Sequence, residues 1–342
     1  MKTFFPLLGI LFLINCTSVD SSQTETEDPP VTQPVAESEW TTINAEGEPL
    51  ARHENAFTEL NGKFYLIGGR KNKPINIYDP ATNKWSEGAM PPLEMHHFQA
   101  LPFQDKIYVL GAFTGGFPHE TPIPDVYAYV PATNQWEKVA SIPESRRRGA
   151  AGVVAYQDKI YVLCGIQDGH YDGHVAWLDE YNPATGEWIE LPDAPRPRDH
   201  FQGAVKGTKL YAAGGRNTSA KTKQTMELTI DEVDVYDFST GEWMTLENQL
   251  PTERAGATSI VVDDQLIVIG GESGSQVPAH SEVEALDLKK LVWRVWPSLK
   301  QGRHGTQGFL HKESLYIAAG SGDRGGGPEL TSLEKYTVAE NK

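Results

Sequence analysis

Cysteine and basic residues are both scarce in this chain of 342 residues. There are two cysteines, Cys16 and Cys164, so a scaffold held by several disulfides is excluded, and so is a zinc site built from cysteine pairs. Lysine and arginine number 30 against 46 aspartates and glutamates, which gives a net charge of −16. Because phosphate binding needs a basic surface, we expect no nucleic-acid partner, although the composition still permits a local basic site.

The common enzyme and cofactor motifs are also missing. The sequence has no His-Glu-x-x-His zinc motif and no Gly-x-Ser-x-Gly nucleophile elbow. The glycine-rich segment 320–329 lacks the Lys-Ser/Thr of a phosphate loop, and we interpret it as a rim loop that presents Asp323 and Arg324. We therefore expect no metal and no cofactor.

A hydrophobic run long enough to span a bilayer is absent from the N-terminus. The apolar run over residues 4–14 follows Lys2 and is too short for a membrane-spanning helix, so residues 1–15 are interpreted as a signal peptide. The end of this segment resembles a bacterial lipobox, from which Asn15 departs, and the resemblance implies lipidation of Cys16. The alternative is a soluble secreted protein. We expect an exported chain, lipid-anchored in the bacterial cell envelope, in the periplasm or at the outer-membrane surface.

Residues 16–39 are rich in Ser, Thr, Glu, Asp, Pro and Gln and have almost no apolar side chains. Such a segment cannot offset its ordering entropy by burial, so a disordered acidic tether is predicted. Residues 40–342 are predicted to form one domain, which is large enough to bury about three quarters of the surface of its unfolded chain.

Two fixed intervals recur along this domain, and they define six copies of one pattern. An arginine stands 17 positions before a glycine, and a tyrosine or leucine stands seven positions before a tryptophan. The first interval joins Arg52 to Gly69, Arg148 to Gly165, Arg198 to Gly215, Arg254 to Gly271 and Arg303 to Gly320, with Met95 and Ala112 in the second copy. The second joins Tyr78 to Trp85, Tyr129 to Trp136, Tyr181 to Trp188, Tyr236 to Trp243 and Leu286 to Trp293.

Each interval fits a hairpin of two short strands rich in Val, Ile, Leu and Tyr. Two hairpins make a four-stranded antiparallel sheet, and a sheet that is apolar on both faces must stack on its neighbours. Small residues such as Gly203 and Ala204 suit a first strand at a crowded central axis. We predict an all-β fold, a six-bladed β-propeller. Because the last copy lacks its tryptophan and Trp40 precedes the first copy, residues 40–43 are predicted to close the sixth blade.

The glycine doublet after the second strand, the following tyrosine and the tryptophan seven residues later resemble the kelch repeat. The resemblance covers residues 40 to 342, and Gly111-Ala112 and Cys164-Gly165 depart from the doublet. It implies a galactose oxidase-like propeller fold, and it leaves function open because kelch repeats occur in binding adaptors and in enzymes. A copper radical oxidase is disfavoured, because Cys164 stands in a doublet and is interpreted as a buried small residue.

Both the arginines and the doublets fall on one face of such a propeller, the face with loops of variable length, where binding residues usually lie. The predicted anion site consists of Arg52, Arg148, Arg198, Arg254 and Arg303, joined by His53, His96, His97, His200 and His304. The alternative is that the repeated arginine is part of the framework and bonds to neighbouring loops and carboxylates. The kelch resemblance implies that the residue after the doublet also faces the ligand, which adds Arg70 and Arg216. The loop 168–174 has two histidines four apart between carboxylates, which is either an acid/base or metal cluster or a solvated loop.

Two functions follow from this face. The first is a noncatalytic protein, expected to be monomeric, that captures an acidic glycan or a protein partner and meets the membrane only through its lipid anchor. The second is an enzyme similar to the bacterial kelch epimerases that interconvert anomers of sialic acid, which need a carboxylate clamp and an acid/base pair. A paired Arg and Glu or His at the channel mouth would favour the enzyme, and a broad exposed apolar rim would favour a protein partner.

Overall fold

The computed structural model describes Met1 and residues 39–338. The predicted signal peptide, Cys16 and nearly all of the predicted tether lie outside the described residues. In the part of the chain that is described, no helix is long and apolar enough to cross a membrane.

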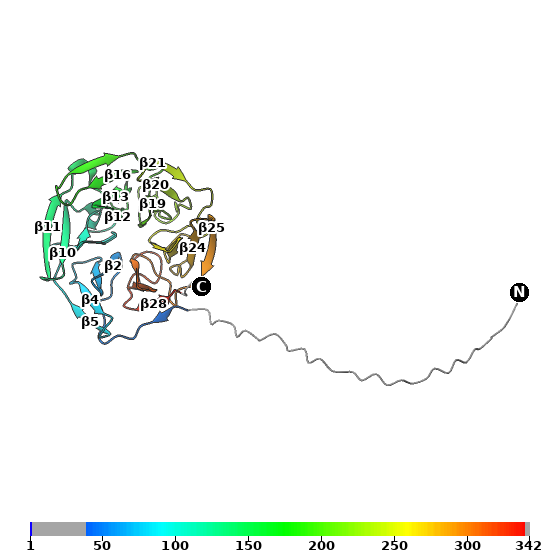
Figure 1. The fold of residues 1–342 in the computed structure, drawn as a ribbon, viewed down its shortest axis with the longest axis horizontal. Coiled ribbons are helices and arrows are strands. Elements are labelled where there is room, and N and C mark those ends of the chain that lie inside the picture. Colours follow the sequence, from blue (N-terminus) through cyan, green and yellow to red (C-terminus); the bar gives the residue numbers. More distant parts are fainter. Residues whose placement is uncertain (2–38, 339–342) are drawn as a thin grey trace, which may run out of the picture. The chain divides into compact units, whose positions relative to one another are not determined.

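Six four-stranded antiparallel sheets follow one another around a central axis as the blades of a propeller (Figure 1). Blade 1 consists of β2 (Asn55–Leu60), β3 (Lys63–Gly68), β4 (Asn76–Asp79) and β5 (Lys84–Glu87). Blade 2 consists of β6 (Leu101–Phe103), β7 (Lys106–Val109), β10 (Asp125–Val130) and β11 (Gln135–Ser141). Blade 3 consists of β12 (Gly152–Tyr156), β13 (Lys159–Leu163), β16 (Leu178–Tyr181) and β17 (Trp188–Leu191).

The second half of the ring repeats this arrangement. Blade 4 consists of β18 (Gly203–Lys206), β19 (Lys209–Ala212), β20 (Asp234–Asp237) and β21 (Glu242–Thr245). Blade 5 consists of β22 (Thr258–Val262), β23 (Gln265–Ile269), β24 (Val283–Asp287) and β25 (Val292–Trp296). Blade 6 consists of β26 (Gly308–His311), β27 (Ser314–Ala318), β28 (Leu333–Thr337) and the N-terminal β1 (Thr41–Thr42). The six-bladed fold predicted from the intervals is confirmed.

The N-terminal strand closes the ring, as predicted. Strand β1 pairs antiparallel with β28, with Thr41 opposite Lys335. Trp40 is buried, its ring lies 5.5 Å from that of Tyr336, and its indole N–H donates to the carbonyl of Pro297. The sixth blade therefore receives from the N-terminus the tryptophan that the other blades carry on their own outer strand.

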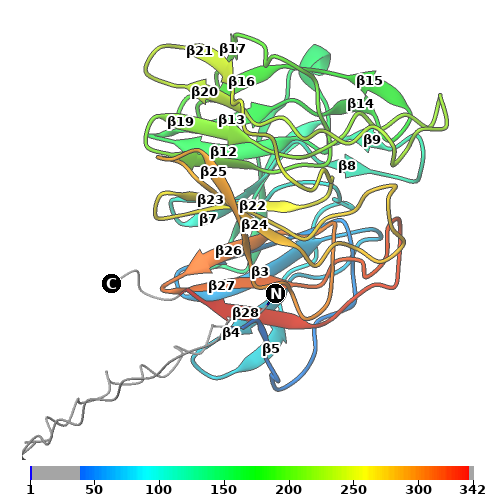
Figure 2. The same ribbon diagram turned by 90° about the vertical axis from the view of Figure 1, so that its right-hand side faces the viewer.

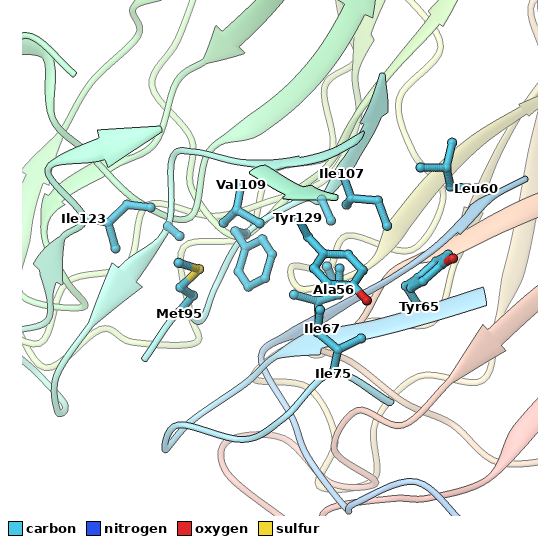
Figure 3. Packing of buried hydrophobic residues seen from close by; sticks show 13 residues of the cluster. Ala56, Leu60, Tyr65, Ile67, Ile75, Met95, Ile107, Val109, Ile123 and Tyr129 are labelled. Atoms are coloured by element: carbon cyan, nitrogen blue, oxygen red, sulfur yellow. The ribbon is translucent and has the colours of Figure 1, made fainter. Parts of the chain in front are cut away.

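Apolar side chains fill the wedges between neighbouring blades. Figure 3 shows one wedge, where Ile67 and Tyr65 of blade 1 face Val109 and Tyr129 of blade 2. Because each sheet is covered on both faces by its neighbours, the cores run around the ring rather than lying at its centre.

Loops that follow the second strand of the blades build one side of the disc. Two of these loops carry additional hairpins, β8 (Phe113–Thr114) with β9 (Thr121–Pro122) and β14 (Ile166–Asp168) with β15 (Asp172–His174). Figure 2 shows both hairpins on the same side of the ring. A single turn of 3-10 helix, Glu144–Arg146, precedes blade 3. The blades thus form the rigid scaffold, and this face carries the longest loops.

Candidate functional site

The five arginines of the 17-residue interval are framework residues. Each is buried, and each donates to the backbone carbonyl sixteen positions later, with donor–acceptor distances of 2.7 to 3.1 Å. Each also donates to a side chain of the third strand of its own blade. The pairs are Arg52–Asn76, Arg148–Asp179, Arg198–Asp234, Arg254–Glu284 and Arg303–Glu334.

This geometry corrects the expectation that these five arginines converge as an anion site. A buried guanidinium already bound to a carboxylate or amide and to backbone carbonyls has little capacity left for a ligand. Burial lowers the pKa of Arg52 to about 10, and Glu329 and Glu87 act in the opposite direction. The framework alternative is the one that fits the structure.

A pocket of about 440 Å³ opens at the mouth of the channel, on the face with the long loops. All six blades contribute to its wall. The lining residues are His53, Glu54, Arg70, His97, Phe117, His170, Arg216, Thr225, Met226, Glu272, Gly325 and Gly326. Four of the residues predicted from the sequence, His53, Arg70, His97 and Arg216, therefore do line one cavity.

Two arginine–glutamate pairs stand in this wall. The Arg70 guanidinium donates to Glu120 at 2.6 Å, and Arg216 donates to Glu272 at 2.6 Å. Burial by itself would raise the pKa of Glu272, but His304 and Arg216 lower that pKa to about 2. The Nη2 atom of Arg216 makes no hydrogen bond within residues 39–338, so a donor remains on a side chain that faces the pocket.

Three buried histidines from three blades meet where the pocket adjoins the channel cavity: His170 lines the pocket, His200 lines the cavity and His97 lines both. The Nε2 atoms of His170 and His200 lie 3.0 Å apart, and the ring centroid of His97 lies 4.9 Å from each of the other two rings. Carboxylates surround them. Glu120 accepts from Nδ1 of His170 at 2.9 Å, Asp199 contacts Nδ1 of His200, and Glu54 lies 3.3 Å from Nε2 of His97.

The surrounding charges hold these groups in defined states. Burial alone would raise the pKa of Glu120, but the hydrogen bond from His170 and the charge of Arg70 bring it well below its usual range. Burial and the neighbouring His96 hold the pKa of His97 well below its ordinary value, so this imidazole is neutral. The site therefore contains ionised carboxylates next to at least one neutral histidine, an arrangement suited to proton transfer or to cation binding.

The remaining predicted residues have other positions. His304 is buried, and its Nε2 lies 2.9 Å from the backbone carbonyl of Asp323 and 3.4 Å from Glu272. Arg324 donates to the carbonyl of Gly274 at 2.7 Å on the rim. His200 faces the narrow cavity of the channel itself, of about 30 Å³, which His97 and Glu54 also line.

Sequence reasoning missed the acidic half of the site, namely Glu54, Glu120, Asp199 and Glu272. One signal was present: Glu272 stands directly after a glycine doublet, the position that singled out Arg70 and Arg216. His170 belonged to the loop 168–174, for which a solvated loop was an alternative, and it is buried. Glu120 carries no pattern of its own, because only the folded ring brings it between Arg70 and His170.

Comparison with known proteins identifies a common architecture. Residues 21–279 match the family model described as Attractin/LZTR1 beta-propeller. Kelch-like protein terF of Aspergillus terreus is 27% identical over 317 residues, which are 85% of this chain and 66% of that protein, so part of that relative has no counterpart in the match. N-acetylneuraminate epimerase of Haemophilus influenzae is 24% identical over 298 residues, 70% of this chain and 79% of the relative.

A solved structure has the same fold. The structure titled "Structure of YjhT" superposes with a TM-score of 0.70 and 19% sequence identity, over 84% of this chain and 96% of that one. At this identity the likeness establishes the propeller fold.

Proposed function

For this chain, which belongs to the Attractin/LZTR1 family of kelch-repeat β-propellers, we propose that the pocket at the channel mouth binds a small molecule bearing hydroxyl and carboxylate groups, such as an acidic sugar. The kelch fold itself is compatible with protein-binding and with epimerase-like roles. The observation that carries the proposal is the pocket of about 440 Å³, a volume suited to a small ligand, with Arg70 and Arg216 in its wall.

The chemistry of the wall supports a polar ligand. Arginine binds carboxylates through its planar fork of N–H donors, and both pocket arginines are held in place by buried glutamates. Phe117 is 59% exposed and lines the pocket, so its ring is available to stack on a sugar. Among the described loops after the second strands, the large exposed hydrophobic residues are Phe117 and Val277, which is less apolar surface than a broad protein-docking rim requires.

The test is a thermal-shift and calorimetric screen of the chain against acidic sugars and their neutral counterparts. A ligand that binds the native state raises the melting temperature by mass action. We expect acidic sugars to raise the melting temperature of the unsubstituted chain. In Arg70→Gln, the affinity for these sugars should be at least tenfold lower. Arg70 is partly exposed and outside the framework set, so this variant should fold. The proposal fails if no acidic sugar binds, or if Arg70→Gln binds as well as the unsubstituted chain.

A second candidate function is acid/base catalysis on the same ligand, as in an epimerase or mutarotase. It is favoured by the two arginine–glutamate pairs and by the contact of His170 with Glu120 in one wall, because anomer interconversion needs a carboxylate clamp and a proton donor and acceptor. Exchange between anomers of a bound acidic sugar, followed by NMR, distinguishes the two functions. Faster exchange that is lost in Glu120→Gln supports the enzyme, and binding without faster exchange supports a receptor.

Export and lipid anchoring at Cys16 are part of the same proposal. They rest on the apolar run over residues 4–14 and on the lipobox-like segment before Cys16. Expression in a bacterial host with a metabolically incorporated fatty-acid label tests them. Label should enter the full chain and not Cys16→Ser, and an unlabelled cytoplasmic product would contradict the proposal.

A further inference from the structure

The three-histidine cluster between the pocket and the channel cavity has a feature that sugar binding does not explain. The side chains of His97, His170 and His200 are buried, and one nitrogen of each lies within 4.8 Å of those of the others. The nitrogens of His170 and His200 that face each other are both Nε2, at 3.0 Å. What occupies the space between them depends on which ring nitrogens carry protons.

The carboxylates fix the tautomers of two of the rings. An ionised carboxylate only accepts hydrogen bonds. Glu120 therefore takes the Nδ1–H of His170, and Asp199 takes the Nδ1–H of His200. In the neutral imidazoles, both Nε2 atoms then carry lone pairs. Two lone pairs that face each other at 3.0 Å repel, unless a proton or a metal ion lies between them.

The third ring is fixed by a relay that ends at a backbone carbonyl. The carbonyl of Gly115 accepts from Nε2 of His96 at 2.9 Å, so Nδ1 of His96 is an acceptor when that ring is neutral. The Nδ1 atoms of His96 and His97 lie 2.6 Å apart, so Nδ1–H of His97 is the donor and Nδ1 of His96 is the acceptor. His97 is left with a lone pair on Nε2, which faces Glu54 at 3.3 Å.

One nitrogen of each of the three rings thus lies next to a common space, within 4.8 Å of the other two. We propose that this space binds a divalent first-row transition-metal ion, ligated by imidazole nitrogens of His97, His170 and His200, with the carboxylate of Glu54 beside it at 3.3 Å from Nε2 of His97. Zinc–nitrogen bonds of about 2.0 to 2.1 Å at a tetrahedral angle place two ligand nitrogens roughly 3.3 Å apart. The observed 3.0 Å between His170 and His200 is close to that separation.

Charge balance points in the same direction. The buried carboxylates of the site are Glu54, Glu120, Asp199 and Glu272, and the guanidiniums are Arg70 and Arg216. The four carboxylates outnumber the two guanidiniums, and His174, 3.3 Å from Asp199, is a further partner of these acids. The excess of carboxylates favours a bound cation.

The carboxylates that hold His170 and His200 make the contacts typical of residues next to a metal ligand. A metal-ligating histidine usually donates its other N–H to a carboxylate, a backbone carbonyl or water, which orients the ring and strengthens the ligand. Glu120 and Asp199 do this here for His170 and His200. Glu54 and His97 line both the pocket and the channel cavity, which gives an ion a route in. The proposed metal site is separate from sugar binding, and either proposal can be correct without the other.

The experiment uses the full chain without a histidine tag, freed of metal by a chelator and then dialysed. Zn²⁺ is titrated calorimetrically near neutral pH, and Co²⁺ is titrated by visible absorption. We expect one ion per chain, a rise in melting temperature with Zn²⁺ that the chelator reverses, and a d–d absorption band that saturates at one equivalent of Co²⁺. The proposal is overturned if the unsubstituted chain shows neither Zn²⁺ binding nor a Co²⁺ band.

Variants locate the ion. His170→Gln and His200→Gln should each abolish the Co²⁺ band, and Glu120→Gln should weaken Zn²⁺ binding about 10- to 100-fold, as expected for an outer-shell partner. The matched control is His280→Gln, because His280 is equally buried and contacts Glu282 and Ser273 outside the cluster. Undiminished Zn²⁺ binding in both cluster variants would place the ion elsewhere and overturn the assignment. If a cluster variant does not fold, Zn²⁺ binding in Glu120→Gln decides the location, and unweakened binding there would overturn the assignment.

Discussion

The guanidinium of Arg254 donates to the backbone carbonyl of Gly270 at 2.7 Å, and four other arginines make the same bond to the residue sixteen positions later. This bond ties the entry to the first strand of a blade to the end of its second strand. The spacing cannot change without breaking it, because the hairpin between the two ends is a fixed unit. The constant 17-residue interval in the sequence is thus a consequence of this hydrogen bond.

Removing this arginine should destabilise the fold. In Arg254→Ala, Glu284 and the carbonyls of Gly270 and Val268 lose their buried donor, and breaking a buried ion pair costs about 3 to 5 kcal/mol. The loss is measured as the change in free energy of unfolding in urea. Arg70→Ala, which removes a partly exposed arginine, is the control and should cost less. Equal stability of Arg254→Ala and the unsubstituted chain would contradict the framework role.

Ring closure makes a second prediction. Trp40 is buried against Tyr336, and it is held to blade 6 without a covalent link inside the blade. Trp40→Ala should lower the free energy of unfolding by about 3 to 5 kcal/mol, the usual cost of deleting a buried aromatic side chain. Trp293 occupies the same position in blade 5 but is only partly buried, so Trp293→Ala should cost less. The opposite order would show that closure does not depend on the N-terminal strand.

The fold was predictable because its constraints are local in sequence. The second glycine of each doublet adopts a positive φ, and a Cβ on Gly215 would lie 2.9 Å from the carbonyl oxygen of Asp199. The first position also has a positive φ, but it accepts Cys164 and Ala319 at 54° and 58°. The departure at Ala319 was not anticipated and does not disturb the sixth blade. The first position of the doublet can therefore be substituted by a small residue without loss of the blade structure.

The site was less predictable, because side-chain direction is set by partners distant in sequence. Arg198 and Arg216 are both arginines on the same face, yet Arg198 turns into its own blade toward Asp234 whereas Arg216 lines the pocket. The partner acids did leave a trace, since Asp234 stands two residues before Tyr236, as Glu334 does before Tyr336. No comparable trace exists for Glu120, whose partners belong to two other blades.

Cys164 should be chemically inert in the folded protein. Its side chain is fully buried, and burial raises the pKa of its thiol to about 12. Only the thiolate is a nucleophile, so the raised pKa slows reaction with a disulfide reagent near pH 8 about a thousandfold, before steric exclusion is counted. The measurement uses Cys16→Ser, so that Cys164 is the one remaining thiol, and compares native with urea-unfolded protein. Fast reaction of the native thiol would contradict the buried position.

The pairing of Glu272 with Arg216 predicts a specific loss of stability in acid. The folded-state pKa of Glu272 is about 2, because His304 and Arg216 outweigh the opposing effect of burial. A lowered carboxyl pKa gives stability that is fully present above the unfolded value of about 4.5 and is lost as the pH falls towards 2. The contribution at neutral pH is about 3 kcal/mol.

Glu272→Gln should therefore be less stable than the unsubstituted chain at pH 6. The difference in free energy of unfolding should shrink as the pH falls from 5 to 3, because the Glu272 carboxyl of the unfolded chain takes up a proton in this range while that of the folded chain stays ionised. Urea denaturation at each pH measures it. Glu313, an exposed residue, supplies the control, because Glu313→Gln should follow the unsubstituted chain at every pH. A stability difference that stays constant down to pH 3 would mean that Glu272 acts through shape rather than charge, and that Arg216 is held in the pocket wall by its other contacts, with Thr218 and Met226.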